Sequence, residues 1–384
     1  MKEGIDILID KTNWKKYRFD EVCKQINVTS KKPEADGLHY VIGLEHIEPG
    51  NLHITKWETL EKETTFTRKF VKGQVLFGRR RAYQRKVAYA EFDGICSGDI
   101  LVFEAIEENL TPELLPFLIQ SDGFFEKALA TSAGSLSPRT KFKGLADYEF
   151  LLPPKDEQKR LAELLWAADE MIEKEKKELE ILKDQIQVYI NDNCNIIGKP
   201  KIPFSNLVNV NPTTRITEKE VSLITMTDIS EEGELLNHEK VVVSDYKSKG
   251  LTPFQENDIL FAKITPCMEN GKGSIARGLY NGKGLGSTEF HVLRPKVATD
   301  LYFCYYLTMS KRFRKLAERQ MTGSAGQKRV QAEFFDFYKL YAPDIEQRKI
   351  IGDKLYEIDC SIATVKNQIS LSQQLKQELI NKIF

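Results

Sequence analysis

A long stretch without proline or glycine in the middle of the chain constrains its fold more than any other feature. Pro153 and Pro154 end an extended segment, and no further proline or glycine follows until Gly198, which predicts one long helix. Apolar residues recur in it alternately four and three positions apart, the heptad pattern of a helix that packs against a partner. The members of this seam are Leu161, Leu165, Ala168, Ile172, Leu179, Leu182, Ile186 and Tyr189, with Glu175 as the polar member.

The sequence contains its own candidate for the partner helix. The segment 342–347 (APDIEQ) repeats 153–158 (PPKDEQ), and the two Glu-Gln pairs are 347 − 158 = 189 positions apart in a chain of 384 residues. A second heptad seam follows this repeat. Its members are Ile351, Leu355, Ile358, Ile362, Val365 and Ile369, after which we expect it to shift near Ser372 and to resume at Leu371, Leu375, Leu379 and Ile383.

Further landmarks repeat in the same order and indicate a tandem duplication. The matched segments are 74–79 with 258–263, 94–97 with 284–287, 111–130 (helical, with a glycine interruption) with 301–320, and the Gly/Ser loop from 131 with 322–329. We predict an α+β fold in which two pseudo-symmetric mixed α/β domains are joined by two long antiparallel coiled-coil helices. The predicted boundaries are 1–152 for the first domain, 153–198 for the central helix, 199–341 for the second domain and 342–384 for the C-terminal helix.

Composition restricts the class of protein. The chain is 41% hydrophobic and 29% charged, with 56 basic against 56 acidic residues, which is typical of a globular protein and argues against an indiscriminate polycation. It contains neither a run of about 18 apolar residues nor a secretory signal. The six cysteines are scattered, which favours reduced thiols and predicts a cytoplasmic protein.

The most strongly basic part of the sequence is the segment 64–90, which has no acidic residue. Arg and Lys can bind phosphates and guanine edges, and Gln can pair with adenine. A solvated loop is the alternative interpretation, but the density of cations favours contact with nucleic acid. The candidate DNA-binding residues of this segment are Arg79, Arg80, Arg81, Tyr83, Gln84, Arg85 and Lys86.

Further candidates lie in the Gly/Ser-rich loops, whose backbone amides can approach phosphates. They are Ser135, Arg139 and Lys141 in the first copy and Lys263, Lys272, Arg277, Ser324, Lys328 and Arg329 in the second. The basic helix 311–319 is equally compatible with DNA contact and with a solvated face. From Leu161 to Tyr189 the helical seam would span about 40 Å, close to one turn of B-DNA, about 34–36 Å.

The sequence shows no catalytic constellation, so we predict a protein without an active site or a metal centre. His39, His46 and His53 are seven positions apart, which is not a compact metal-ligand spacing, and we expect them on the surface or in strands. Gly271–Ser274 lacks the spacing of a Walker A loop, and there is no nucleophile elbow. Asn211–Thr214 resembles an amino-methyltransferase motif for two residues but lacks its second proline and its aromatic residue.

The repeated motifs are similar to those of one known family. The chain resembles the DNA-specificity (S) subunits of type I restriction–modification enzymes over nearly its whole length. The resemblance rests on the two Pro-x-x-Glu-Gln motifs (154–158 and 343–347) before amphipathic helices, the Gly loop 323–329 and the strand 258–261. The first copy departs from the pattern, because Gln74 replaces the acidic start of the strand and 135–139 replaces Gln-Lys-Arg.

The resemblance implies two target-recognition domains, each reading one half of an asymmetric bipartite sequence in double-stranded DNA. It implies that the helices set the spacer between the halves and dock two methyltransferase (M) subunits. The resemblance also implies that the methyltransferase subunits bind S-adenosylmethionine and that restriction (R) subunits use ATP. We expect this chain itself to take no cofactor and to contact no membrane. The specificity subunit of a type IIB restriction–modification system and a coiled-coil scaffolding protein are the alternatives.

Overall fold

The computed structural model describes residues 9–60, 64–134, 137–194, 196–246, 250–324 and 326–384. The chain divides into two compact units, Met1–Lys176 with Asn367–Phe384, and Lys177–Lys366. Each unit is described on its own below. Within the described residues, no helix combines the length and the apolar character that a membrane crossing requires.

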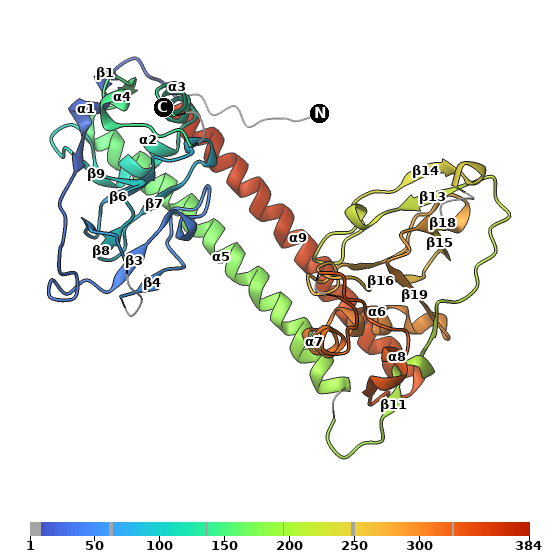
Figure 1. Ribbon diagram of the computed structural model, residues 1–384. Helices are drawn as coiled ribbons and strands as arrows, with labels where there is room; N and C mark the ends of the chain where they lie inside the picture. The colour runs from blue at the N-terminus through green and yellow to red at the C-terminus, as the bar shows by residue number, and fades with distance from the viewer. Residues whose placement is uncertain (1–8, 61–63, 135–136, 195, 247–249, 325) are drawn as a thin grey trace. The chain divides into compact units, whose positions relative to one another are not determined.

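The first unit contains two four-stranded sheets and the short α-helices α1 to α4 (Figure 1). One sheet has the order β2-β9-β6-β7 and is antiparallel, and the other has the order β4-β3-β8-β5, in which β3 and β8 are parallel. A separate strand pair joins β1 to β10. The elements are β1 (Lys15–Arg18), α1 (Phe19–Val22), β2 (Cys23–Ile26), β3 (Tyr40–Ile42), η1 (Leu44–His46), β4 (Glu58–Thr59), β5 (Arg68–Phe70), β6 (Val75–Gly78), η2 (Ala82–Gln84), β7 (Val87–Tyr89), β8 (Gly94–Cys96), β9 (Ile100–Ala105), η3 (Pro112–Leu114), α2 (Leu115–Gln120), α3 (Asp122–Ala130), α4 (Phe142–Leu145) and β10 (Glu149–Leu152).

The second unit repeats this topology. Its sheets have the orders β12-β19-β16-β17 and β14-β13-β18-β15, with β13 and β18 parallel, and β11 pairs with β20. The elements are β11 (Ile202–Pro203), η4 (Phe204–Asn206), β12 (Val208–Val210), β13 (Glu220–Ile224), η5 (Met226–Asp228), β14 (Glu239–Val242), η6 (Val243–Tyr246), β15 (Thr252–Gln255), β16 (Ile259–Ala262), β17 (Gly273–Ile275), η7 (Tyr280–Gly282), β18 (Lys283–Gly286), β19 (Phe290–Pro295), η8 (Ala298–Asp300), α6 (Leu301–Met309), α7 (Lys311–Arg319), α8 (Phe334–Phe337) and β20 (Lys339–Leu340).

The predicted duplication is therefore confirmed at the level of strand order. The matched Gly-x-x-Ser segments form β8 and β18, which pair in parallel with β3 and β13 respectively. A packing reason underlies the match, because a Cβ atom at Gly94 would lie 2.7 Å from the Phe70 ring, and one at Gly284 would overlap the Phe254 ring. Each sheet therefore needs a glycine where a phenylalanine covers the central strand.

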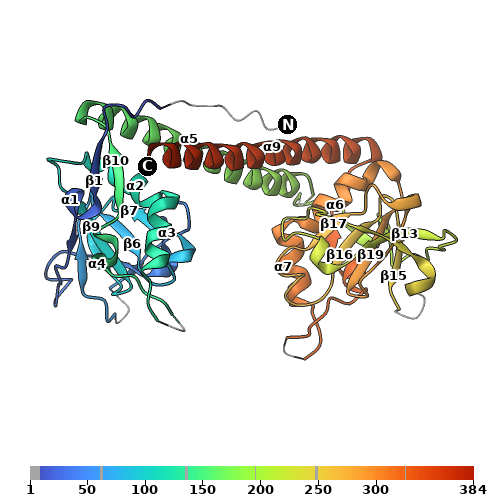
Figure 2. The same ribbon diagram turned by 90° about the horizontal axis from the view of Figure 1, so that it is seen from above.

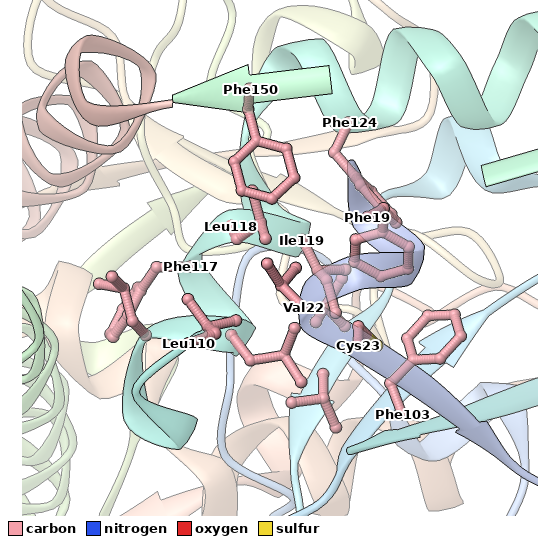
Figure 3. Close-up of a cluster of buried hydrophobic side chains, with 14 of the residues drawn as sticks. Phe19, Val22, Cys23, Phe103, Leu110, Phe117, Leu118, Ile119, Phe124 and Phe150 are labelled. Carbon is pink, nitrogen blue, oxygen red and sulfur yellow. The ribbon is translucent and has the colours of Figure 1, made fainter. Parts of the chain in front are cut away.

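Phenylalanine clusters form the cores that support these sheets. In the first unit, the rings of Phe19 and Phe124 lie 4.8 Å apart, and Phe103 packs edge-on to Phe19 at 5.5 Å (Figure 3). Burial of each such ring contributes roughly 2–3 kcal/mol. Figure 2 shows α3 beside β6 in the first unit, and α6 and α7 beside β16 and β19 in the second.

A serine, not a glycine, interrupts the paired helical segments. The hydroxyl of Ser121 accepts a hydrogen bond from the Phe124 amide, and Ser310 does the same for Phe313. Each serine caps the second helix of its pair, which is the favoured role of serine at a helix start. The expected glycine interruption is wrong, because Gly123 lies inside α3.

The two predicted long helices are α5 (Lys155–Cys194) and α9 (Ile345–Ile383). In the first unit they pack antiparallel, because Asp169 contacts Lys376 whereas Glu175, further along α5, contacts Ser372, which is earlier in α9. Most of the predicted seam residues are buried or half-buried. Leu165, Ile172, Ile186, Leu355, Ile358, Ile362 and Val365 are buried, and Leu161, Leu179, Leu182 and Ile369 are half-buried.

The expected shift of the α9 seam is wrong. Leu371 and Leu375 are 58% and 38% exposed, whereas Lys376 is 6% exposed. The heptad continues without interruption through Ser372 and Lys376 to Leu379. An apolar pattern could not predict this course, because two polar residues, the half-buried Ser372 and the buried Lys376, occupy the seam positions.

The structural register of the duplication also differs from the sequence match. The side chain of Gln158 donates to the Pro153 carbonyl, and its counterpart is Arg348, which donates to the Pro343 carbonyl. The two helices likewise begin at Lys155 and Ile345. The helices are therefore related by 348 − 158 = 190 positions, one more than the Glu-Gln pairs indicate.

Candidate nucleic-acid interface

In the first unit, a tight hairpin between β6 and β7 presents the basic segment. Arg81 and Arg85 both have left-handed backbones, with φ of 55° and 52°, on either side of the short helix η2. Non-glycine residues hold this conformation at a cost of roughly 1–3 kcal/mol, so the surroundings must enforce it. Ala82 is buried, and Tyr83 is 58% exposed at the tip.

Two neighbouring segments hold this hairpin in place. The Arg81 amide donates to the Pro138 carbonyl at 3.0 Å, and the Thr140 amide donates to the Arg79 carbonyl at the same distance. The Arg79 amide donates to the Asp99 carbonyl at 2.9 Å. The hairpin 79–86, the turn 97–99 and the loop 137–141 therefore form one surface, which we call the first basic surface.

Asp99 orders the arginines of the first basic surface. It accepts from Arg139 Nε at 2.7 Å and from an Arg80 terminal nitrogen at 3.3 Å. Burial alone would raise the pKa of Asp99, but the hydrogen bonds and charges of Arg139 and Arg80 hold it below its usual value. The two arginine side chains remain 48% and 39% exposed, so they retain donors for a ligand.

Several other predicted contact residues make contacts within the first unit. Arg85 donates to Asp122 at 2.5 Å and lies over the Phe125 ring, and Lys86 donates to the Leu44 carbonyl at 2.6 Å. Burial, with the nearby Arg68 and Arg139, lowers the pKa of Arg79. Gln84 is half-buried, Arg81 and Lys141 are exposed, and Ser135 lies outside the described residues.

The second unit builds the same arrangement from different residues. The Lys263 amide donates to the Glu289 carbonyl, and the Val330 amide donates to the Lys263 carbonyl, both at 2.9 Å. Glu289 accepts from Arg329 at 2.8 Å, and this hydrogen bond lowers the pKa of Glu289 despite its partial burial. Arg329 and Glu289 thus correspond to Arg139 and Asp99. We call Lys263, Ser324, Lys328 and Arg329 the second basic surface; Ser324 and Lys328 are exposed.

Lys272 and Arg277 make contacts within the second unit. Lys272 donates to the Met226 carbonyl at 2.8 Å, which matches the role of Lys86 in the first unit. The Arg277 guanidinium stacks on the Tyr302 ring at 4.8 Å from its centroid.

The basic helix α7 is partly a core element. Arg314 is 7% exposed and donates to the carbonyls of Thr308 and Met268. At the start of the helix, Lys311 contacts Asp184 at 3.3 Å.

Sequence reasoning missed the two acids that organise these surfaces. Asp99 and Glu289 each stand two residues after the serine of a matched Gly-x-x-Ser segment. An acid at this position in both copies is the signal that could have identified them. His53, which was expected on the surface or in a strand, lies half-buried in a loop and contacts the buried carboxylate of Asp169. Among the residues that the structure describes, no three or more His, Cys, Asp or Glu side chains are grouped to hold a metal ion.

The first and second basic surfaces together are typical of a nucleic-acid-binding protein. Two copies of one mixed α/β module each display cations ordered by an acid, which suits contact with phosphates and base edges. The model of the family described as the type I restriction modification DNA specificity domain matches residues 11–184 and 187–377. The chain belongs to this family, and the resemblance inferred from its motifs is confirmed.

Curated relatives and solved structures agree with this assignment. The chain is 34% identical over 217 residues to the type I restriction enzyme EcoEI specificity subunit of Escherichia coli, and 34% identical over 185 residues to the EcoAI specificity subunit of the same species. These alignments cover 55% and 47% of the chain, but only 34% and 31% of the relatives, so the chain spans about a third of their length.

Two solved structures share the fold. One, reported in a study of complex assembly and conformational transition of the type I R-M system, has a TM-score of 0.57 at 16% identity, covering 97% of both chains. The other, the S subunit of a type I restriction–modification system from M. genitalium, has a TM-score of 0.54 at 14% identity, covering 100% of this chain and 98% of that one.

Proposed function

We propose that the chain is the DNA-specificity subunit of a type I restriction–modification complex. Each domain reads one half of an asymmetric bipartite target in double-stranded DNA, and the subunit performs no catalysis of its own. The observation that supports this best is the pair of basic surfaces, built on matched backbone positions in a chain of this family. Asp99 orders Arg139 in one copy, and Glu289 orders Arg329 in the other.

The chemistry of the two basic surfaces differs, which suits two different half-sites. The first exposes arginine and tyrosine side chains, Arg81 and Tyr83. The second exposes serine and lysine, Ser324 and Lys328. Arginine can form bidentate contacts with guanine, whereas lysine is a point donor that suits phosphate oxygens. This difference suits an asymmetric target.

The proposed partners follow from the same role. Helices α5 and α9 would set the spacer between the half-sites and dock two methyltransferase subunits, and restriction subunits would complete the complex. S-adenosylmethionine and ATP would bind those partners, whereas this chain would need no cofactor. The outer faces of the helices carry Lys and Glu together with exposed apolar side chains, Ile181 and Leu371 at 67% and 58% exposure, which suits a protein partner.

Mapping DNA methylation tests the proposal. The chain is produced together with its methyltransferase subunits in cells that lack other adenine methylation, and all methylated positions are mapped across the genome. We expect one motif with two specified parts and an unspecified spacer. Cells that receive the methyltransferase subunits without this chain should lack the motif. A contiguous motif, or the same motif without this chain, contradicts the proposal.

A further inference from the structure

A loop of the first domain reaches the helix pair through His53. The loop belongs to the domain, because Leu52 is fully buried in its core and the Leu52 carbonyl accepts from the Tyr89 amide at 2.8 Å. The Asn51 side chain accepts from the His53 amide at 2.9 Å and fixes its backbone. His53 is therefore held by the domain before it contacts either helix.

The half-buried imidazole of His53 links the exposed Glu91 to a buried ion pair between the two helices. His53 Nε2 lies 2.9 Å from Asp169 Oδ2 on α5, and His53 Nδ1 lies 3.1 Å from Glu91 Oε1. The other oxygen of Asp169 accepts from Lys376 Nζ on α9 at 2.5 Å. Asp169 and Lys376 are only 3% and 6% exposed. The edge-on ring of Trp166 adds a further contact to His53. We call His53, Glu91, Asp169 and Lys376 the His53 junction.

Such a junction tolerates little displacement. Charges taken out of water are stable only when they are paired and hydrogen-bonded in good geometry. Asp169 divides its two oxygens between a cation of the domain and a cation of α9. A shift of the domain along the helices would therefore separate His53 from a buried carboxylate. The free-energy cost of that shift is larger than it would be if only apolar side chains lay between the domain and the helices.

The corresponding loop of the second domain uses the opposite charges. Short helices precede both loops: Gly43 donates to His46 at the first, and Thr225 donates to Asp228 at the second. In the second unit Glu234 accepts from Lys366 of α9 at 2.6 Å. Glu232 also pairs with Lys366, and with Lys183 of α5 at 3.0 Å. One domain thus offers a cation to its helix segments, and the other offers acids.

We propose that His53 is a positioning residue, which fixes the first recognition domain on α5 and α9 through Asp169 and Lys376 and thereby sharpens the choice of spacer length in the DNA target. The inference rests on the proposed function. A domain fixed to the helices resists DNA whose half-sites are displaced, whereas a loosened domain accommodates them at lower cost.

The test compares spacer choice in two histidine variants. The chain is assembled with its methyltransferase subunits, and methylation rates are measured on the natural target and on targets with one base pair more or fewer in the spacer. His53→Gln should lower the ratio between natural and altered spacers by about tenfold, the size expected for loss of a hydrogen bond to a charged group. His39→Gln is the matched control, because His39 is exposed, and should keep the wild-type ratio.

The pH profile separates positioning from a general loss of stability. The hydrogen bond to Asp169, opposed by burial and assisted by Glu91, raises the pKa of His53 to about 9, against about 6.5 in an unfolded chain. The charged imidazole therefore stabilises the folded state fully below about pH 6.5, and this stabilisation is lost as the pH rises through about 9. The ratio of methylation rates on natural and altered spacers should fall for the wild type between about pH 7 and about pH 10. The same ratio for His53→Gln should not change with pH.

The outcomes distinguish the inference from the function on which it rests. If the wild-type complex discriminates between spacers but His53→Gln discriminates equally well, the positioning role is wrong. A wild-type ratio that does not change with pH would also show that the positioning role is wrong. This second measurement needs only the wild-type protein, so it can be made even if the variant fails to fold. If the wild-type complex has no two-part target, the proposed function itself is wrong.

Discussion

At the residue scale, neighbouring cations of one basic segment have different roles because their partners differ. Arg85 and Lys86 are engaged by Asp122 and by a backbone carbonyl. Arg81, four residues before Arg85, is exposed. The sequence predicts the density of charge in this hairpin but not this division, because the acid and the carbonyl approach only in the folded domain.

A pair of alanine variants tests this division. Arg81→Ala should weaken binding to the target duplex and reduce the salt slope by about one, because one cation fewer at the interface releases fewer counterions from the DNA. Lys86→Ala should instead lower the melting temperature and leave the salt slope unchanged, because Lys86 donates to the Leu44 carbonyl. Fluorescence anisotropy over a series of salt concentrations measures the slope. An unchanged slope for Arg81→Ala would remove Arg81 from the interface.

At the scale of elements, the periodicity of the sequence predicts both long helices. In the structure each helix begins just after its proline-containing segment, as expected. The periodicity fails in α9, where half-buried Ser372 and buried Lys376 occupy the seam and Leu371 and Leu375 are exposed. Lys376 is buried because Asp169, on the other helix, pairs with it. A pattern of apolar residues within one helix carries no information about such a partner, so a buried ion pair in a seam escapes it.

Aspartate substitutions on two faces of α5 test the packing of the seam. Ile172→Asp should lower the free energy of unfolding by roughly 3 kcal/mol or more, because Ile172 is 2% exposed and the new carboxylate would be buried without a partner. Ile181→Asp is the control, because Ile181 is 67% exposed on the same helix, and it should change stability little. Denaturant titration measures both. Equal stability of the two variants would mean that Ile172 does not pack against α9 as described.

At the scale of the whole molecule, the chain is a duplication whose two copies share topology and differ in chemistry. Both copies place an arginine on an acid at matched positions, Arg139 on Asp99 and Arg329 on Glu289. The order of landmarks in the sequence was sufficient to predict the duplication and the mixed α/β modules. The partners of the basic residues were not predictable, because the carbonyls that accept from Lys86 and Lys272 approach them only in the folded domains.

The central claim, that each domain reads its own half of the target, is tested most directly by mapping methylation with one basic surface altered at a time. The complex is produced with Arg81→Ala and, separately, with Lys328→Ala, and the methylated motif of each is compared with that of the wild type. We expect Arg81→Ala to relax one part of the two-part motif and Lys328→Ala to weaken modification through the other part only. Relaxation of the same part, or of both parts equally, by either variant would contradict the account.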